Sequence, residues 1–525
     1  MPLPRPAFLK STALALSLAL SATVVATVPA AAQDIEIRLT PFHQAVAEAA
    51  ARDEDLAAFY RERGFEGVWL GDEAASHRAA FFAAMEDAHV HGLPEARFDP
   101  YAVMSMLENA RTADALGRAE VEMSRIFLDF AREMENGVLI PSRVNNLIKR
   151  EVLYTPRREQ LEGYFANAPV GYLRQLAPNS PEYQRLLRVK MQMEQQLRDG
   201  GYGPGVTASL REGSVGVQVV HLRNRLMAMG FLDRTVTTTF DTQMKEAVMA
   251  FQSSIGLNPD GVVGGATLSA LNVPLEDRLK QVLVAMERER WMNNLERGQR
   301  HVWVNLTDFT AAIVDDDHVT FRTRSVIGAH ALSRQTPEFS DTMEHMVINP
   351  YWYVPRSIIN GEYGGRVPAG FEAVNYRGQI VNTRDASNVS VRQRPGPGNA
   401  LGRVKFMFPN SYNIYLHDTP SQHLFANPVR AYSHGCIRLD DPYDFAYELL
   451  RVQEDDPVGF FQSRLNSGAN THVPLDQPVP VHLIYRTAFT NADGLMNYRN
   501  DIYGRDAEVW NALAAAGVAI GAVGG

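Results

Sequence analysis

The apolar pattern of this 525-residue chain changes near Trp291, and that change limits the folds available to it. Before Trp291, apolar side chains recur at helical spacing, as in Met123 to Met134, where Phe127 and Phe130 share one face. After Trp291, short alternating runs such as Val302 to Val304 are separated by Asp-rich turns, which favours strands. The sequence therefore predicts a multidomain α+β protein, with helical domains first and a mainly β domain second.

The first 32 residues have the three parts of a secretory signal peptide. Arg5 and Lys10 precede an apolar run from Thr12 to Val28, and small residues follow up to Ala32. We predict cleavage after Ala32, export, and no stable membrane insertion afterwards. An uncleaved membrane anchor is the alternative, because the apolar run is long enough to be marginal for a span. The net charge of −9 gives no electrostatic reason to expect a nucleic acid partner.

Boundaries within the helical part follow from local signals. Residues 33–203 are expected to form a helical domain, in which Ser180 and Pro181 open a helix that ends at Gly200. Residues 204–274 contain two related halves, with apolar residues repeating at three and four before Gly230 and again before Gly256. These halves predict a small three-helix domain. Residues 275–300 are expected to form a connecting helix.

Cys436 is the only cysteine in the chain, and its neighbours favour a nucleophile. Ser433 and His434 precede it and Arg438 follows it, a polar and partly cationic setting that should favour the thiolate. Gly435 supplies a sharp turn that exposes the sulfur. The competing interpretation, a buried structural cysteine, would place these polar groups in a core without evident partners.

His417 ends an apolar run with strand character and is the candidate general base, its tautomer fixed by the nearby backbone of Asp418. The backbone N–H groups of Gly435 and Cys436 are the expected donors to a developing oxyanion. His434 is an alternative base. A zinc site using His417, His434, Cys436 and His423 is a weaker alternative, because the chain has no CxxC pair and no HExxH motif; otherwise His423 is treated as a loop residue.

Beyond these residues, the chain resembles the L,D-transpeptidases of bacterial cell walls, and within them the large multidomain periplasmic branch. The resemblance covers most of Arg290 to Leu450. Its segments are Arg290–Trp291, Val304–Asn305, Gln335–Pro337, Asn349–Pro355, Arg392 to Gly402, Lys405 to Asn410, and Tyr415 to Leu439.

The resemblance implies a role for each part of the chain. Residues 33–203 would be a scaffold domain, 204–274 a peptidoglycan-binding domain, and 301–508 the catalytic domain, in which a lid at about 360–402 covers the active site. Residues 509–525 are expected to be a C-terminal tail, frayed along the Ala- and Gly-rich stretch from Ala514 to Gly525. Ser433 and His434 would hold the turn in shape. The expected substrate-binding residues are Tyr415, Asn349, Trp352, Arg392 and Asn399.

The implied function is transfer of a peptidoglycan stem peptide in the periplasm. Cys436 would attack a carbonyl of the stem and expel the terminal D-alanine, which forms an acyl-enzyme. An amine of another stem would then attack this acyl-enzyme. Arg438 would hold a substrate carboxylate or lower the thiol pKa. A carboxypeptidase or endopeptidase that uses the same cysteine, and a wall-binding protein without activity, are the alternatives; a papain-like peptidase is more distant. Stem peptides are the expected partners, with an accessory periplasmic protein left open. No cofactor and no metal are expected.

Overall fold

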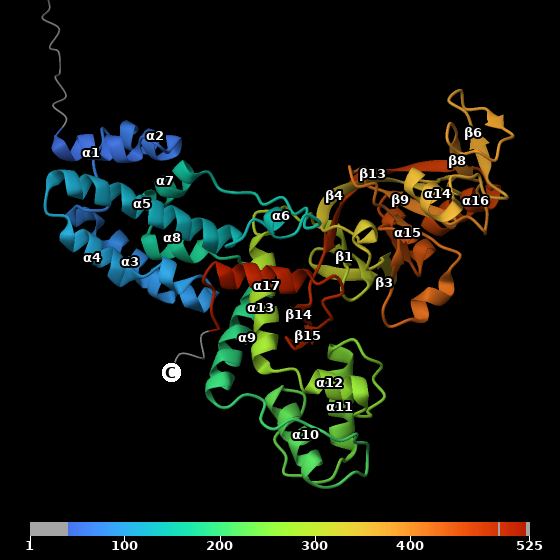
Figure 1. Cartoon of the computed structure of the whole chain (residues 1–525), viewed down its shortest axis with the longest axis horizontal. Coiled ribbons are helices and arrows are strands. Elements are labelled where there is room, and N and C mark those ends of the chain that lie inside the picture. The colour runs from blue at the N-terminus through green and yellow to red at the C-terminus, as the bar shows by residue number, and fades with distance from the viewer. Residues whose placement is uncertain (1–39, 492–493, 521–525) are drawn as a thin grey trace, which may run out of the picture. The chain divides into compact units, whose positions relative to one another are not determined.

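The computed structural model describes residues 40–491 and 494–520, and the predicted signal peptide lies outside them (Figure 1). From Pro41 onward the chain forms one compact unit. None of the described helices is long and apolar enough to cross a membrane.

The helical part of the chain packs around a core to which the long helix α5 (Ala113–Asn136) contributes a continuous apolar face. Phe127 and Phe130 on this face are fully buried, as their helical spacing predicts. Helix α9 (Pro181–Arg198) begins at the predicted site, with the Ser180 hydroxyl accepting a hydrogen bond from the Tyr183 N–H. The other helices are α1 (Pro41–Ala50), α2 (Glu54–Glu62), α3 (Ala75–Glu86), α4 (Pro100–Asn109), α6 (Pro141–Val144), α7 (Arg157–Ala166) and α8 (Pro169–Leu176).

The predicted small domain contains helices α10 (Val217–Ala228), α11 (Thr242–Ser254) and α12 (Gly265–Leu271), which share a separate core. Leu222 and Leu226 of α10 and Val248 of α11 are completely buried in it. The two repeated apolar stripes therefore face each other.

Helix α13 (Leu275–Arg290) follows, and it is buried along most of its length. The C-terminal helix α17 (Arg505–Ala515) packs against it, and Val509, Leu513 and Val518 are buried in the helical core. The prediction of a frayed stretch from Ala514 is therefore wrong for the described residues up to 520. The abundant alanine and glycine of this segment hid a short apolar stripe at helical spacing.

The C-terminal part of the chain is built on one large mixed sheet with strand order β11-β3-β12-β10-β9-β4-β13-β1-β2. Its apolar face forms the second major core together with helices α15 (Pro442–Leu450) and α16 (Pro457–Ser467). The strands are β1 (Arg300–Asn305), β2 (Thr310–Asp315), β3 (His318–Gly328), β4 (Phe339–Ile348), β9 (Val404–Met407), β10 (Leu416–His417), β11 (Ala431–Ser433), β12 (Ile437–Leu439) and β13 (Thr471–Ile484). A short hairpin, β14 (Ala488–Thr490) with β15 (Met496–Tyr498), follows.

The segment expected to be an irregular lid has a fold of its own. A small sheet of order β5-β8-β6-β7 joins helix α14 (Arg356–Tyr363) around a separate apolar cluster that includes Ile359, Ala386 and Val391. We call this unit, residues 352–393, the cap. Its strands are β5 (Trp352–Tyr353), β6 (Glu372–Val374), β7 (Ile380–Val381) and β8 (Ser390–Gln393). They are too short to give a clear alternating pattern in the sequence.

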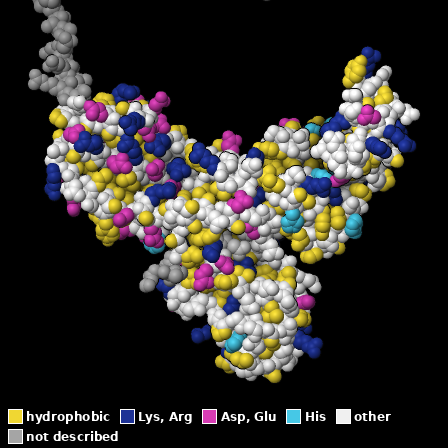
Figure 2. All heavy atoms as spheres, viewed as in Figure 1, with side chains coloured by type: hydrophobic (Ala, Val, Ile, Leu, Met, Phe, Trp, Pro, Cys, Tyr) yellow, Lys and Arg dark blue, Asp and Glu magenta, His cyan; other side chains and the backbone are white. Residues whose placement is uncertain are grey.

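On the face shown in Figure 2, acidic and basic side chains are mixed over the helical part of the molecule. Neither acidic nor basic side chains predominate over the helical part in this view. This mixture agrees with the modest net charge of −9.

Candidate active site

The candidate site lies on one face of three neighbouring strands, β9, β10 and β12. Strand β10 pairs parallel with β12, placing His417 opposite Arg438, and antiparallel with β9, placing His417 opposite Lys405. Successive side chains of a strand point to opposite faces, so Tyr415 and Cys436, two residues earlier, share the face of His417 and Arg438. The alternate residues of these strands fill the apolar core on the other side. The sheet therefore gathers a thiol, an imidazole, a phenol and two cations.

The turn before Cys436 is held by hydrogen bonds. Gly435 has a φ of +117°, a conformation that favours glycine, and its N–H donates to the Ser433 hydroxyl at 3.0 Å. That hydroxyl donates in turn to the Cys436 carbonyl at 2.5 Å. The Thr336 hydroxyl donates to the Gly435 carbonyl at 2.7 Å. The Gly435 N–H is thus occupied by Ser433, which contradicts its expected role as an oxyanion donor.

The Cys436 thiol is half-buried and donates to the Asn413 carbonyl at 3.5 Å. Burial raises the pKa of this thiol to about 11, although hydrogen bonding by Tyr415 and the charges of Arg438 and Lys405 act in the opposite direction. The expectation that the setting favours thiolate is therefore wrong. Loss of hydration at the partly buried sulfur outweighs the flanking cations.

His417 is buried, and its Nδ1 lies 2.5 Å from the Asp418 carbonyl oxygen. Because a carbonyl only accepts hydrogen bonds, Nδ1 carries the proton and Nε2 is left as a free base. Burial, followed by the charges of Arg438 and Lys405, lowers the pKa of His417 to about 3. The imidazole is therefore neutral across the physiological pH range.

Two cations flank these groups. Burial lowers the pKa of both Arg438 and Lys405. The charge of Cys436 acts in the opposite direction on each but is the smaller effect. The Nε of Arg438 is buried without a hydrogen-bond partner among the described residues, so this guanidinium has capacity for a ligand oxygen. Lys405 lies over the Tyr415 ring, 5.6 Å from its centroid. Sequence reasoning did not single out Lys405, whose position follows from the pairing of β9 with β10.

His434 links the turn to the cap. Its Nε2 lies 2.7 Å from a carboxylate oxygen of Glu362 on α14, and Arg334 contacts the same oxygen at 3.3 Å. Helix α14 therefore reaches the Cys436 turn through one carboxylate shared by two basic residues.

The other predicted substrate-binding residues lie in structural positions. The buried Asn349 amide donates to the Arg464, Leu465 and Ala469 carbonyls and accepts from Arg403. The buried Asn399 amide contacts backbone groups of its own loop and Pro350. With their side chains occupied, neither presents a group to a ligand, so their substrate-binding assignment finds no support in these contacts.

Trp352 and Arg392 belong to the cap. Trp352 packs against Phe371, with ring centroids 6.0 Å apart. Arg392 pairs with Glu372 at 2.7 Å and contacts the Tyr353 hydroxyl at 3.1 Å. Both residues stabilise the small sheet of the cap.

For the zinc alternative, the described residues contain no group of three or more His, Cys, Asp or Glu arranged to hold a metal ion. His423 is exposed on a short helix, Gln422–Ala426.

The raised thiol pKa predicts slow alkylation of the free protein. Only thiolate reacts, so at pH 8 we expect about 100-fold slower reaction with iodoacetamide than for an exposed cysteine of pKa about 8.5. The rate should rise with pH through about 11. Rates measured by intact mass from pH 6 to pH 11 test this, since the chain has one cysteine. A midpoint below pH 8 would contradict the burial argument, and Tyr415→Phe should lower the rate at each pH below 11, because the Tyr415 hydroxyl holds the thiol pKa down.

Comparisons with known proteins agree with this organisation. Residues 299–458 match the YkuD family, described as the L,D-transpeptidase catalytic domain. Residues 54–189 match a scaffold domain, and residues 215–271 match a "Putative peptidoglycan binding domain".

A curated relative from Haemophilus influenzae, named "Putative L,D-transpeptidase", is 29% identical over 228 residues, which is 40% of this chain and 45% of the relative. The match thus spans less than half of that protein. Solved L,D-transpeptidase structures from Xylanimonas cellulosilytica and Stackebrandtia nassauensis are 17% and 14% identical, with TM-scores of 0.16 and 0.22. They cover 54% of this chain each, and 100% and 96% of their own chains. Because these TM-scores are low, we draw no conclusion about the fold from the two structures.

Proposed function

Since residues 299–458 match the YkuD family of L,D-transpeptidase catalytic domains, we propose that this chain crosslinks peptidoglycan stem peptides through a thioester on Cys436. The observation that carries the proposal is the convergence of Cys436, His417 and Arg438 on one polar face of the sheet. A thioester stores the energy of the cleaved amide, so a second amide can form without ATP.

In the first half-reaction, the Cys436 sulfur attacks the carbonyl that precedes the terminal D-alanine. The Nε2 of His417 accepts the thiol proton and passes it to the departing amine, and the C–N bond breaks as the thioester remains. Burial raises the pKa of the thiol and lowers that of His417, which favours proton transfer during the attack over a preformed thiolate–imidazolium pair. The Cys436 N–H is the remaining candidate donor for the oxyanion, because that of Gly435 is occupied.

In the second half-reaction, an amine of a neighbouring stem attacks the thioester. His417 takes a proton from this amine and returns one to the sulfur, which restores the free thiol. The leaving D-alanine and the stems carry carboxylates, which suits the two cations Lys405 and Arg438. We assign the partly exposed guanidinium of Arg438 to one of these carboxylates.

Water would divert the thioester to a carboxypeptidase product, so the cap decides between the two reactions. Its helix α14 contacts the Cys436 turn through Glu362 and His434. A covered site protects the intermediate until an amine arrives, and this contact favours transfer over hydrolysis. The matched peptidoglycan-binding domain, residues 215–271, fits retention on the cell wall, and we place the mature protein in the periplasm.

Product analysis tests this function. Residues 33–525 incubated with purified disaccharide tetrapeptide should yield crosslinked dimers that have lost one D-alanine, detected by mass spectrometry. Tripeptide without dimers would establish the carboxypeptidase instead. Unchanged substrate together with retention on insoluble cell wall would favour a binding protein without activity.

A further inference from the structure

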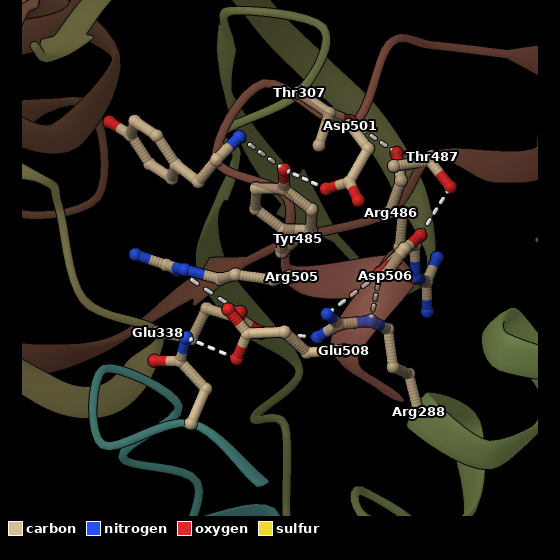
Figure 3. A network of polar contacts seen from close by, with 12 residues as sticks. Arg288, Thr307, Glu338, Tyr485, Arg486, Thr487, Asp501, Arg505, Asp506 and Glu508 are labelled. Atoms are coloured by element: carbon tan, nitrogen blue, oxygen red, sulfur yellow. Dashed lines mark hydrogen bonds and ion pairs between the residues drawn. The ribbon is translucent and has the colours of Figure 1, made fainter. Parts of the chain in front are cut away.

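Figure 3 shows a network of polar contacts that includes four buried charged side chains, Arg288, Glu338, Arg505 and Asp506. Arg288 of α13 lies between Glu338, its closest ion-pair partner, and Asp506, whose oxygen is 2.8 Å away. Arg505 of α17 contacts the other oxygen of Glu338 at 3.1 Å. The exposed fractions of these side chains range from 0% to 8%, and two positive charges balance two negative ones. The network is thus internally neutral and shielded from water.

The network continues to the turn through Thr336. Arg505 donates to the Thr336 carbonyl at 2.7 Å. The Thr336 hydroxyl accepts from the Gly328 N–H at 2.9 Å and donates to the Gly435 carbonyl at 2.7 Å. Each step is a direct hydrogen bond between buried groups. A chain of contacts therefore runs from helix α17 to the residue before the nucleophile.

A second contact from the C-terminal segment supports the same strand end. The Tyr503 hydroxyl donates to the Gly328 carbonyl at 2.6 Å, and the Thr336 N–H donates to that hydroxyl at 3.4 Å. Gly328 pairs with Ser433 in the sheet, next to the turn. Tyr503 and Arg505 thus hold the two segments, at Gly328 and Thr336, on which the turn rests.

Arg288, Tyr503, Arg505 and Asp506 all lie outside residues 299–458, the segment that matches the catalytic family. They belong to the helix after the small domain and to the C-terminal segment. The support of the turn therefore comes from parts of the chain that no family match describes as catalytic.

We propose that Thr336 and Arg505 are positioning residues for Cys436, fixing the Gly435 carbonyl and thereby the direction of the thiol and of the Cys436 N–H. The reactive consequence rests on the proposed acyl transfer. Preorganised groups of this kind matter because displacement of a reacting atom by about 1 Å can reduce the rate about 100-fold. The four buried charges are held in ion pairs, so moving any one of them leaves an unpaired charge in the interior.

The test is Thr336→Val, which keeps the shape of the side chain and removes both of its hydrogen bonds. We expect kcat for dimer formation to fall about 100-fold with little change in KM. We also expect iodoacetamide to alkylate Cys436 about 10-fold faster at pH 8, because a loosened turn exposes the thiol and its pKa falls toward the ordinary value. Thr336→Ser keeps the hydroxyl, so its kcat and its alkylation rate at pH 8 should equal those of the unaltered protein.

Thr307→Val is the matched control. Thr307 is also buried, and its hydroxyl also makes hydrogen bonds, to Asn305 and to the Arg486 carbonyl, but it does not contact the turn. It should lower the melting temperature and leave the alkylation profile unchanged. Tyr503→Phe removes only one hydroxyl. It should shift the alkylation profile in the same direction as Thr336→Val, by a smaller amount. It replaces Thr336→Val as the test if that variant does not fold.

Alkylation needs no peptidoglycan substrate, so it separates this proposal from the proposed function. A shifted alkylation profile in a protein without transferase activity would support positioning and reject the activity. Identical alkylation profiles and kcat values for Thr336→Val and Thr307→Val would overturn the positioning role. An unchanged profile in Tyr503→Phe would overturn it if Thr336→Val is unfolded.

Discussion

Replacing Cys436 by alanine is expected to abolish dimer formation, with a loss of about 10⁶-fold, the scale observed when a covalent nucleophile is removed from an enzyme. No other residue can replace it, because the chain contains no second cysteine. The measurement is dimer formation from disaccharide tetrapeptide under the conditions used for the unaltered protein.

The control for this variant is cell-wall binding. Retention on insoluble peptidoglycan should be unchanged in Cys436→Ala, since residues 215–271 lie in a separate domain with its own core. An unchanged melting temperature would exclude a folding defect. If the variant still formed dimers at more than a thousandth of the original rate, Cys436 would not be the nucleophile.

Replacing His417 by glutamine is expected to reduce kcat about 10³-fold, the usual scale for a general base. The glutamine amide can still donate to the Asp418 carbonyl, so the local structure should survive. What is lost is the neutral nitrogen that accepts the thiol proton. Single-turnover rates of D-alanine release measure this step directly.

His434→Gln and His423→Gln are the matched variants. His434 contacts Glu362 of the cap, so its loss should raise the fraction of hydrolysed product while D-alanine release remains within about 10-fold. His423 is exposed and should have no effect. If His434→Gln lost about 10³-fold and His417→Gln did not, the base would be His434.

The sequence alone predicted the features that depend on local pattern. The change near Trp291 from helical spacing to alternation predicted the α+β class, which the structure and the family matches confirm. The start of α9 followed from Ser180 and Pro181, because capping is a property of neighbouring residues. Cys436 stood out because it is unique and surrounded by polar residues.

What the sequence could not supply depends on tertiary packing. The raised thiol pKa arises from partial burial in the folded chain, whereas the local pattern shows only the flanking cations. Lys405 reaches the site because β9 pairs with β10. The Gly435 N–H is occupied because Ser433 folds back on the turn. None of these arrangements has a signature in residue order, because each depends on which segments become neighbours.

The most direct test of the acyl-enzyme is the intact mass of the protein mixed with tetrapeptide donor in the absence of an acceptor amine. A covalent adduct equal to the donor minus D-alanine, located on the peptide that contains Cys436 and absent from Cys436→Ala, is the expected result. Release of D-alanine with no adduct at any time point, or an adduct on another residue, would contradict a thioester at Cys436.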